Sequence, residues 1–346
     1  MMLDNLRKIS MLDWLENDLL LTIASCEPAS SDASFRRYFR VKAAEGQFIV
    51  MDAPPEKENI EMFIRVAALL AGSQVNVPVI FQKNLTDGFL LLEDFGSTCF
   101  LDRLNPHSAT ALYQSAFDAL FKLQSNTSLQ DGTLPRYNES LLQREMGIFE
   151  DWFLIQWLDI QIPASLWEAV CTILVDSAVE QPVTCVHRDY HSRNLMVLND
   201  DSPGVIDFQD AVIGPITYDL VSLLRDCYIA WPTQQVDLWT EQYYQRLLQA
   251  KIITCPPACF KRWFDLMGMQ RHLKAIGIFS RLHLRDGKSG YLNDIPRTLN
   301  YITTISKAYP ELTGFSDFLQ AHVLPALHEL TAVTQKESGR QVLITP

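Results

Sequence analysis

The segment from His187 to Asp207 constrains this chain more than any other part of its sequence. It opens with a His-Arg-Asp triplet ending at Asp189, and Asn194 follows five residues later. Two short apolar runs joined by a turn come next and predict a β-hairpin, with Asp207 at its end. Such a hairpin would bring Asn194 and Asp207 together as oxygen ligands for Mg²⁺, while Asp189 accepts the proton of an attacking hydroxyl. The segment therefore predicts phosphoryl transfer.

Each of these residues also has an ordinary structural interpretation. Asp189 would then cap a helix, Asn194 would occupy a turn, and Asp207 would be a polar group at the end of a strand. The spacing of all three, with a hairpin between them, favours the chemical interpretation.

Residues 35–100 indicate a compact α+β unit. Runs rich in aromatic and β-branched residues predict strands over 35–41, 47–51, 77–82 and 89–92. Between the second and third of these, apolar residues at helical spacing predict a helix over 56–71 that ends at Gly72.

Beyond residue 97 the pattern is mainly helical. Helices are predicted over 106–125, 138–159, 163–180, 215–229, 233–251, 257–284 and 316–334, interrupted by strand character near 183–213. The fold class is therefore α+β, with a small N-terminal β-rich lobe joined near residues 93–97 to a larger, mainly helical C-terminal lobe.

Charge and cysteine usage narrow the class of partner. A net charge of −12 argues against nucleic acid and membrane surfaces as partners, because both attract positive proteins. The seven cysteines are scattered and odd in number, as in reduced cytoplasmic proteins. Residues 1–18 predict an amphipathic helix and lack the apolar centre of a signal peptide. We expect a soluble, cytoplasmic protein.

The motif around Asp189 resembles the protein-kinase-like superfamily, in particular its aminoglycoside phosphotransferase and choline kinase branch. In that branch the metal aspartate lies in an Ile-Asp-Phe run like residues 206–208, without the glycine of other kinases. The resemblance implies a bilobal fold that uses ATP and Mg²⁺. Residues 1–94 would form the nucleotide-binding lobe, and residues 95–346 the catalytic and acceptor-binding lobe.

A finer resemblance spans most of the chain, over roughly residues 30–300. The matching segments are residues 31–38, 51–56, 204–211, 214–226, 270–274 and 285–288. They are similar to bacterial kinases that phosphorylate the anomeric hydroxyl of N-acetylmuramic acid and N-acetylglucosamine. The resemblance implies an ATP-dependent amino-sugar kinase that makes sugar 1-phosphates for peptidoglycan recycling.

The same resemblance implies roles for five further residues. Gln209 and Asp210, directly after the metal aspartate, would face the sugar. Arg271, in a basic helix, would bind the lactyl carboxylate of muramic acid; the alternative is a solvated basic face that pairs with acidic neighbours. His187 would be a packed scaffold residue. Asp219 would brace the catalytic loop from the start of a helix, or would simply cap that helix.

The phosphate-binding loop departs from the family pattern. Residues 31–37 occupy its place but contain no glycine. Backbone N–H groups of Ala33, Ser34 and Phe35 are still expected to bind phosphate, with Arg36 or Arg37 adding charge. The alternative is an ordinary basic turn.

The lysine that such kinases place on the ATP phosphates is also missing. Met51 or Asp52 stands at its position. Candidates to replace it are Arg36, Arg37 and Lys57, with Glu61 as the paired carboxylate on the helix.

Glu93, Asp94 and Phe95 are expected to form the hinge that presents backbone groups to adenine, although a plain turn between lobes has the same composition. Two other functions remain open. One is a kinase for another hydroxyl, of choline, homoserine or aminoglycoside type. The other is a nucleotide-binding pseudokinase, which the missing lysine and glycines favour and which the intact Asp189, Asn194 and Asp207 disfavour.

Overall fold

The structure is a computed structural model that describes residues 2–30, 35–130, 132–198 and 202–330. Its packing separates two compact units. The first contains Met1–Pro135 together with His187–Val212, and the second contains Arg136–Val186 together with Ile213–Pro346. The first unit thus holds residues on both sides of the boundary expected near residue 94. The assignment of 1–94 to nucleotide binding and of 95–346 to acceptor binding stays a prediction.

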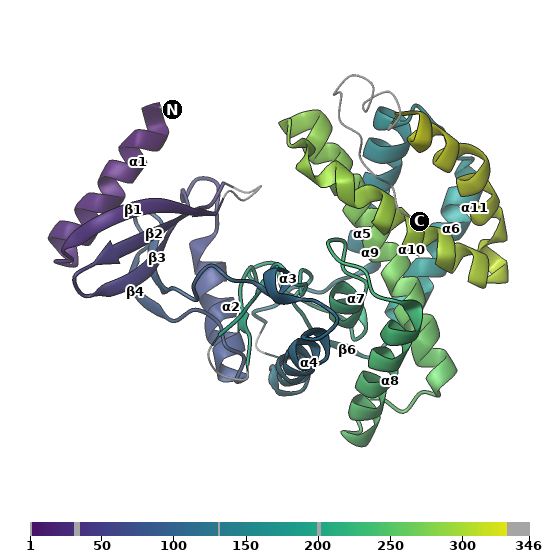
Figure 1. Cartoon of the computed structure of the whole chain (residues 1–346), viewed down its shortest axis with the longest axis horizontal. Helices are drawn as coiled ribbons and strands as arrows, with labels where there is room; N and C mark the ends of the chain where they lie inside the picture. Colours follow the sequence, from purple (N-terminus) through teal and green to yellow (C-terminus); the bar gives the residue numbers. More distant parts are fainter. Residues whose placement is uncertain (1, 31–34, 131, 199–201, 331–346) are drawn as a thin grey trace. The chain divides into compact units, whose positions relative to one another are not determined.

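An antiparallel sheet of five strands, in the order β1-β2-β3-β5-β4, forms the start of the first unit. The strands are β1 Ile23–Ser30, β2 Arg37–Ala43, β3 Gly46–Asp52, β4 Ile80–Asn84 and β5 Phe89–Glu93 (Figure 1). The last four confirm the predicted strands, with ends shifted by a few residues. β1 was not predicted, because it lacks apolar alternation and contains Pro28, which sheets tolerate in edge strands.

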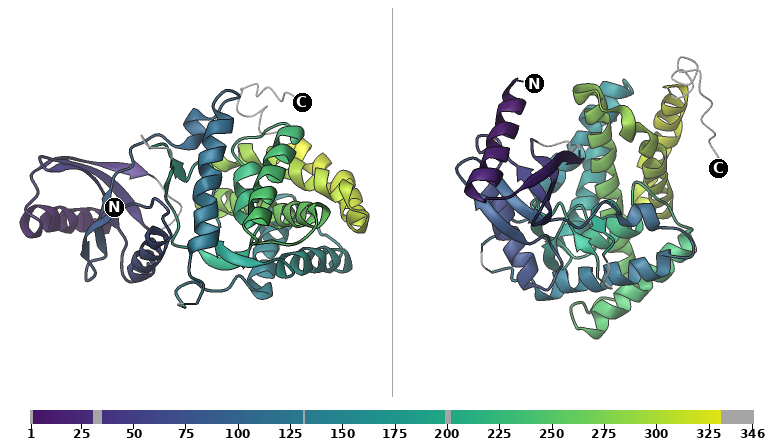
Figure 2. Two further views of the ribbon diagram at one scale, coloured as in Figure 1. Left: turned by 90° about the horizontal axis from the view of Figure 1, so that it is seen from below. Right: turned by 60° about the vertical axis from the view of Figure 1, so that its left-hand side comes forward.

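A helix covers one face of this sheet. α1 (Met2–Asp13) continues into a π-helical turn (Trp14–Asp18), which confirms the helix expected over residues 1–18. Met11, Trp14 and Leu15 are buried in one core with the sheet residues that point to this face, Phe39, Val41, Val50, Phe89 and Leu91. Figures 1 and 2 show α1, in purple, beside the sheet.

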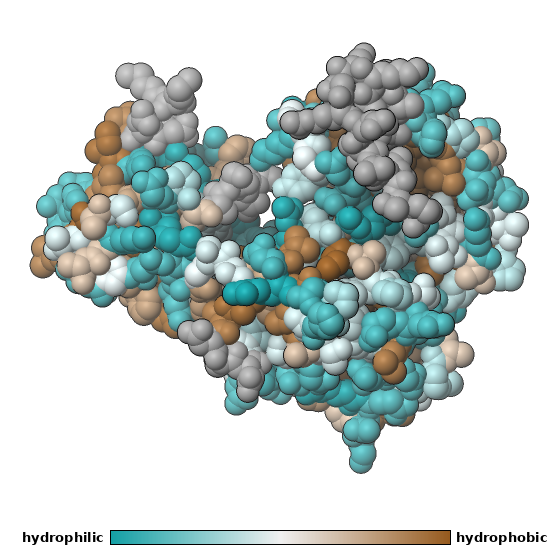
Figure 3. All heavy atoms as spheres, viewed as in Figure 1, coloured by the Kyte–Doolittle hydropathy of each residue, from teal (hydrophilic) through white to brown (hydrophobic). Residues whose placement is uncertain are grey.

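The outward face of α1 is only partly polar. Leu6 and Ile9 are exposed there, and Figure 3 shows hydrophobic atoms over this helix.

α2 (Ile60–Gly72) is the helix predicted over 56–71, and it begins four residues later than expected. Its start is set by Asn59, whose side chain accepts a hydrogen bond from the backbone N–H of Met62 at 3.0 Å. The buried face of α2 includes Phe63, whose ring lies 4.9 Å from that of Phe208. α2 therefore packs against the residue that follows Asp207.

The predicted hairpin is present as two short strands, β7 (Leu195–Met196) and β8 (Gly204–Val205), paired in antiparallel fashion. The backbone N–H of Val205 also donates to the carbonyl of Asn76 at 2.7 Å. Gly204 is required by packing, because a Cβ there would lie 2.4 Å from Cδ2 of Phe95. The first unit is completed by α3 (Phe100–Arg103) and α4 (Ala109–Asn126).

The second unit is mainly helical. Its α-helices are α5 Glu139–Ile148, α6 Ala164–Val179, α7 Tyr218–Leu224, α8 Thr233–Gln249, α9 Pro257–Asp286, α10 Ile295–Ala308 and α11 Thr313–Phe318 (Figure 1). π-Helical segments Phe149–Trp157 and Leu319–Val323 extend α5 and α11, and short 3₁₀ turns cover Ser289–Asp294 and Pro310–Leu312. β6 (Val183–Val186) pairs with β9 (Val212–Pro215).

α9 is the central helix of this unit, since α5, α6, α7 and α10 all pack against it. Within the described residues the helices predicted from the sequence are confirmed, and residues 331–334 of the helix predicted over 316–334 lie outside that part of the chain. α7 is shorter than the predicted 215–229, because Arg225 leaves the helical conformation at φ −118° and ψ 53°. α10 was not predicted; it contains Pro296 and several β-branched residues, which are poor helix formers. Among the described residues, no helix combines the length and the apolar character that crossing a bilayer requires.

Candidate active site

His187 ties the predicted catalytic loop to the strand that leads to Asp207. Its ring is fully buried, and Nε2 lies 3.0 Å from the carbonyl oxygen of Ile206. Nδ1 accepts a hydrogen bond from the backbone N–H of Asp189 at 3.3 Å, so the proton must sit on Nε2. Burial lowers the pKa of His187 to about 4, which keeps the ring neutral near pH 7. These contacts are those that a scaffold residue would make.

Asp189 sits in a tightly turned loop. Arg188, directly before it, has φ +77°, a conformation that residues other than glycine seldom adopt. The backbone oxygen of Asp189 accepts hydrogen bonds from the N–H of His191 and from the side-chain amide of Asn194, both at 3.0 Å. The next residue, Tyr190, is buried and donates its hydroxyl to the carbonyl of Ala116 on α4 at 2.8 Å. Backbone contacts therefore hold the loop, and Asp189 itself is partly exposed.

Asn194 and Asp207 lie together, as the hairpin predicts. Nδ2 of Asn194 is 3.3 Å from Oδ2 of Asp207, and Nε2 of Gln209 donates to Oδ1 of Asp207 at 2.7 Å. Because the amide nitrogen of Asn194 donates to Asp207 and to the backbone of Asp189, its Oδ1 remains as an acceptor. Asp207 has φ +64°, and strained backbone of this kind clusters at functional sites.

The donor set fits a magnesium ion. Within the described residues, no three His, Cys, Asp or Glu side chains gather in the manner of metal ligands, so Asn194 and Asp207 form a two-residue set. Mg²⁺ in phosphoryl-transfer sites uses one or two protein oxygens and completes its shell with phosphate oxygens and water. Asp207 and Oδ1 of Asn194 can supply those two oxygens.

The expected phosphate loop is described only in part. Ala33 and Ser34 lie outside the described residues. Phe35 is 61% exposed, and the ammonium of Lys57 lies 4.5 Å from the centre of its ring. Arg36 forms an ion pair with Glu58, with 3.7 Å between Nε and Oε2. Glu61, the carboxylate expected on the helix, instead pairs with Arg65 on the exposed surface of α2.

Asp52, at the position of the missing lysine, is the centre of a buried ion-pair cluster. It is fully buried, and its Oδ1 accepts hydrogen bonds from Nε and Nη2 of Arg7 at 2.8 and 2.6 Å. Its Oδ2 accepts from Nε of Arg37 at 3.0 Å and also from Nη2 of that residue. No sequence pattern predicts this cluster, because Arg7 and Asp52 belong to separate elements.

The expected hinge is held by side chains as well as backbone. The carboxylate of Asp94 accepts hydrogen bonds from Arg40 at 2.7 and 3.0 Å, from Gln47 at 2.6 Å and from the N–H of Gly96 at 2.8 Å. Burial alone would raise the pKa of Asp94, but these hydrogen bonds outweigh it, and the pKa is lowered from its ordinary value.

The other two hinge residues extend the packing. Glu93 is the last residue of β5 and donates its backbone N–H to the carbonyl of Val79 at 2.9 Å. Phe95 packs against Gly204.

The residues expected to bind the acceptor are divided between the units. Gln209 is buried beside Asp207, and the backbone carbonyl of Asp210 accepts a hydrogen bond from Arg188 at 3.4 Å. Arg271 belongs to the second unit, where it is 5% exposed and its Nη1 lies 3.6 Å from Sγ of Cys227.

Several other basic residues of α9 pair with acidic neighbours. Lys274 lies 3.3 Å from Glu145. Lys261 and Arg262 pair with Asp265 and Glu311. The interpretation of α9 as a helix that pairs with acidic neighbours therefore applies to these residues. Arg271 and Lys274 are nevertheless buried, so the basic face is not fully solvated.

Asp219 lies in the first turn of α7, as predicted, and is fully buried. Thr217 occupies the N-cap position of that helix, so Asp219 is not its cap residue. Its expected contact with the catalytic loop remains a prediction.

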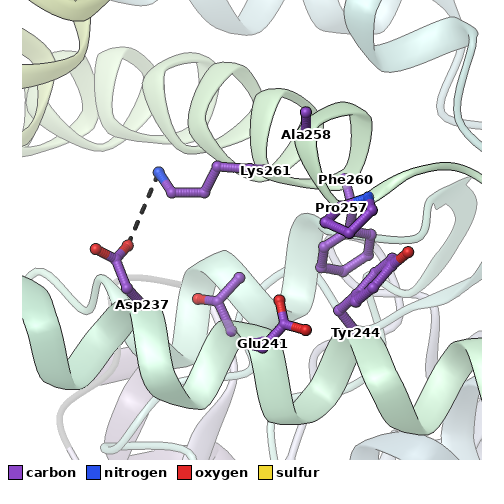
Figure 4. A pocket seen from close by; sticks show the side chains of 8 residues that line it. Asp237, Glu241, Tyr244, Pro257, Ala258, Phe260 and Lys261 are labelled. Carbon is purple, nitrogen blue, oxygen red and sulfur yellow. Dashed lines mark ion pairs between the residues drawn. The ribbon is translucent and has the colours of Figure 1, made fainter.

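A cavity of about 280 Å³ lies elsewhere, between α8 and the first turn of α9. Figure 4 shows Asp237 and Tyr244 on one wall and Phe260 and Lys261 on the other, with an ion pair of 3.9 Å between Asp237 and Lys261. None of the residues predicted from the sequence lines this cavity. It has no part in the chemistry argued from Asp189.

Comparisons with known proteins agree on a family. A sequence model of the phosphotransferase enzyme family matches residues 25–252. An N-acetylmuramate/N-acetylglucosamine kinase of Pseudomonas aeruginosa is 46% identical over 297 residues, which cover 84% of this chain and 87% of that protein. A protein of the same name from Neisseria meningitidis is 40% identical and covers 88% of this chain and 93% of its own length.

Solved structures show the same fold at low identity. The choline kinase of Streptococcus pneumoniae aligns with a TM-score of 0.61 at 12% identity, over 86% of this chain and 99% of that one. The predicted α+β, protein-kinase-like fold is thereby confirmed.

Proposed function

Because this chain belongs to the phosphotransferase enzyme family, we propose that it phosphorylates the anomeric hydroxyl of N-acetylmuramic acid and N-acetylglucosamine with ATP. The products are sugar 1-phosphates, which would enter peptidoglycan recycling. The relatives that carry these sugars in their names are 46% and 40% identical to this chain, whereas the choline kinase is similar only in fold. An amino sugar is therefore a better-supported acceptor than choline, homoserine or an aminoglycoside.

The observation that carries the proposal is the arrangement of Asp189, Asn194 and Asp207. One amide, that of Asn194, donates to the backbone of Asp189 and to the carboxylate of Asp207. Asp189, the proposed proton acceptor, and Asp207, a proposed metal ligand, are thus both hydrogen-bonded to the side chain of Asn194. A protein that only binds nucleotide has no need of the base, so this arrangement disfavours a pseudokinase.

We assign the residues of the proposed site the following roles. Asp189 orients the acceptor hydroxyl and takes its proton. Asn194 and Asp207 hold Mg²⁺, which offsets negative charge on the transferred phosphoryl group when it is bound. Gln209 fixes one oxygen of Asp207 and, with Asp210, faces the sugar. Arg271 binds the lactyl carboxylate.

The position of the phosphate in the product tests the proposal directly. Asp189 can act only on a hydroxyl held in line with the phosphoryl group, so each sugar pose exposes one oxygen. We expect ³¹P-coupled NMR of the product to show phosphate on O1. A 6-deoxy sugar should still be phosphorylated. A 1-deoxy sugar should bind as a competitive inhibitor and release no ADP. Phosphate on O6 would overturn the anomeric assignment and leave the kinase assignment intact.

A further inference from the structure

A chain with a net charge of −12 needs a local cation to bind the phosphates of a nucleotide. Among the described residues next to the expected phosphate loop, Arg36, Arg37 and Lys57 are the basic ones that the sequence leaves as candidates. The structure separates these three by the partners that each of them contacts.

Arg37 lies on the face of the sheet that α1 covers. Its guanidinium shares the fully buried Asp52 with Arg7 of α1, and it lies 5.8 Å from the ring of Phe39. Phe39 is part of the core that α1 covers. Arg37 therefore braces α1 against the sheet, and α1 lies outside the residues that match the family model.

Lys57 is an exposed residue whose ammonium lies over the exposed ring of Phe35. This surface contact does not connect Lys57 to the elements that carry Asp207. Exposed lysines of this kind are ordinarily solvated and contribute little.

Arg36 differs from both, because it is half-buried and paired with a carboxylate that leads to the active site. Its side chain is 12% exposed and that of Glu58 17% exposed. Glu58 directly precedes Asn59, the N-cap of α2, and Phe63 of α2 packs on Phe208, the neighbour of Asp207. One ion pair, the start of α2 and one ring contact thus lead from Arg36 to the neighbour of Asp207.

We propose that Arg36 and Glu58 together take the place of the missing lysine and its helix glutamate. Arg36 contacts the nucleotide phosphates, and Glu58 is a positioning residue that orients it. A guanidinium carries several N–H donors in a rigid fork, so it can pair with Glu58 and still donate to phosphate. This inference rests on the proposed function, because it assumes that the first unit binds ATP.

Nucleotide affinity, measured by calorimetry with ADP and Mg²⁺ and without any sugar, tests the assignment. We expect Arg36→Ala to weaken ADP binding roughly tenfold or more, the usual effect of losing a charge-assisted contact. Arg36→Lys should recover part of that loss. Glu58→Ala should weaken binding less than Arg36→Ala, because it removes only the orienting group.

Two matched variants control for general damage. Arg37→Ala removes a neighbouring arginine and should lower the melting temperature with little change in ADP affinity. Glu61→Ala removes the exposed carboxylate one turn along α2 and should change neither quantity.

Steady-state kinetics supply a second measurement. The KM for ATP should rise in Arg36→Ala while the KM for the sugar stays near that of the wild type. Unchanged ADP affinity in Arg36→Ala, or an equal loss in Arg37→Ala at unchanged melting temperature, would overturn the assignment alone. A wild-type protein that binds no ADP would overturn the proposed function and the assignment with it.

Discussion

At the scale of single residues, the site depends on backbone conformations that the chain adopts at a cost. Arg188 and Asp207 both have positive φ, and a non-glycine residue in the left-handed region costs about 1–2 kcal/mol. The surroundings hold both in place. Arg188 donates a hydrogen bond to the carbonyl of Asp210. The carboxylate of Asp207 accepts hydrogen bonds from the side-chain amides of Asn194 and Gln209. Both strained residues therefore lie within the proposed site.

The proposed roles of Asp189 and Asp207 predict that substituting each of them impairs a different property of the enzyme. Asp189→Asn should lower kcat by about 10²–10⁴-fold, the usual contribution of a general base, while ADP affinity stays near normal. Asp207→Ala should instead abolish the dependence of ADP affinity on Mg²⁺. Rapid-quench kinetics and a Mg²⁺ titration followed by calorimetry measure the two quantities. Most of the wild-type rate in Asp189→Asn would contradict its role as base.

At the scale of elements, close packing of backbones limits the size of the side chain that α9 can have at one position. Gly277 of α9 faces the junction of α5 with its π-helical extension, where an added Cβ would lie 2.5 Å from the carbonyl carbon of Ile148. Backbone atoms cannot move aside as a flexible side chain can. The glycine is therefore what lets these two elements approach.

We expect Gly277→Ala to destabilise the protein by about 1–3 kcal/mol, the usual range for overpacking. Gly147, at the end of α5, is a matched control because an added Cβ there has no atom within 4 Å. Gly147→Ala should stabilise by about 0.5–1 kcal/mol, since alanine is the better helix former. Urea unfolding of both variants measures the difference. Equal stability of the two would show that α9 shifts at no cost.

At the scale of the whole molecule, the residues predicted to bind the acceptor belong to different units. Gln209 and Asp210 belong to the first, and Arg271 to the second. Arg271 is buried beside Cys227, so its substitution will affect stability as well as binding. Selectivity between two sugars separates the effects, because a loss of stability alone acts equally on both.

Arg271→Ala should lower kcat/KM for N-acetylmuramic acid more than for N-acetylglucosamine. Loss of a charge-assisted pair with the lactyl carboxylate is worth roughly 1.5–3 kcal/mol, which corresponds to about a tenfold or larger change in the ratio. Arg271→Lys keeps the charge and should retain part of the preference. Equal losses on both sugars would show that Arg271 supports the fold of the helical unit and does not read the acceptor.

The sequence by itself determined the fold class, most elements and the three candidate site residues Asp189, Asn194 and Asp207. These follow from local information: apolar spacing predicts helices such as α9, and the hairpin between Asn194 and Asp207 follows from two short apolar runs and a turn. Where local signals are weak the prediction missed elements, as for β1 with its edge proline and α10 with its β-branched residues. Both form because neighbouring elements pack on them.

Only the tertiary structure decided how the charged residues pair. In the sequence, Arg36 and Arg37 are equivalent neighbours, and Glu61 is as good a partner as Glu58. Long-range contacts separate them, since Arg37 meets Asp52 and Arg7 of α1 while Arg36 meets Glu58. The physical reason is that ion pairs have no sequence period. Which carboxylate an arginine reaches depends on how separate elements pack, and this is set by the apolar core between them.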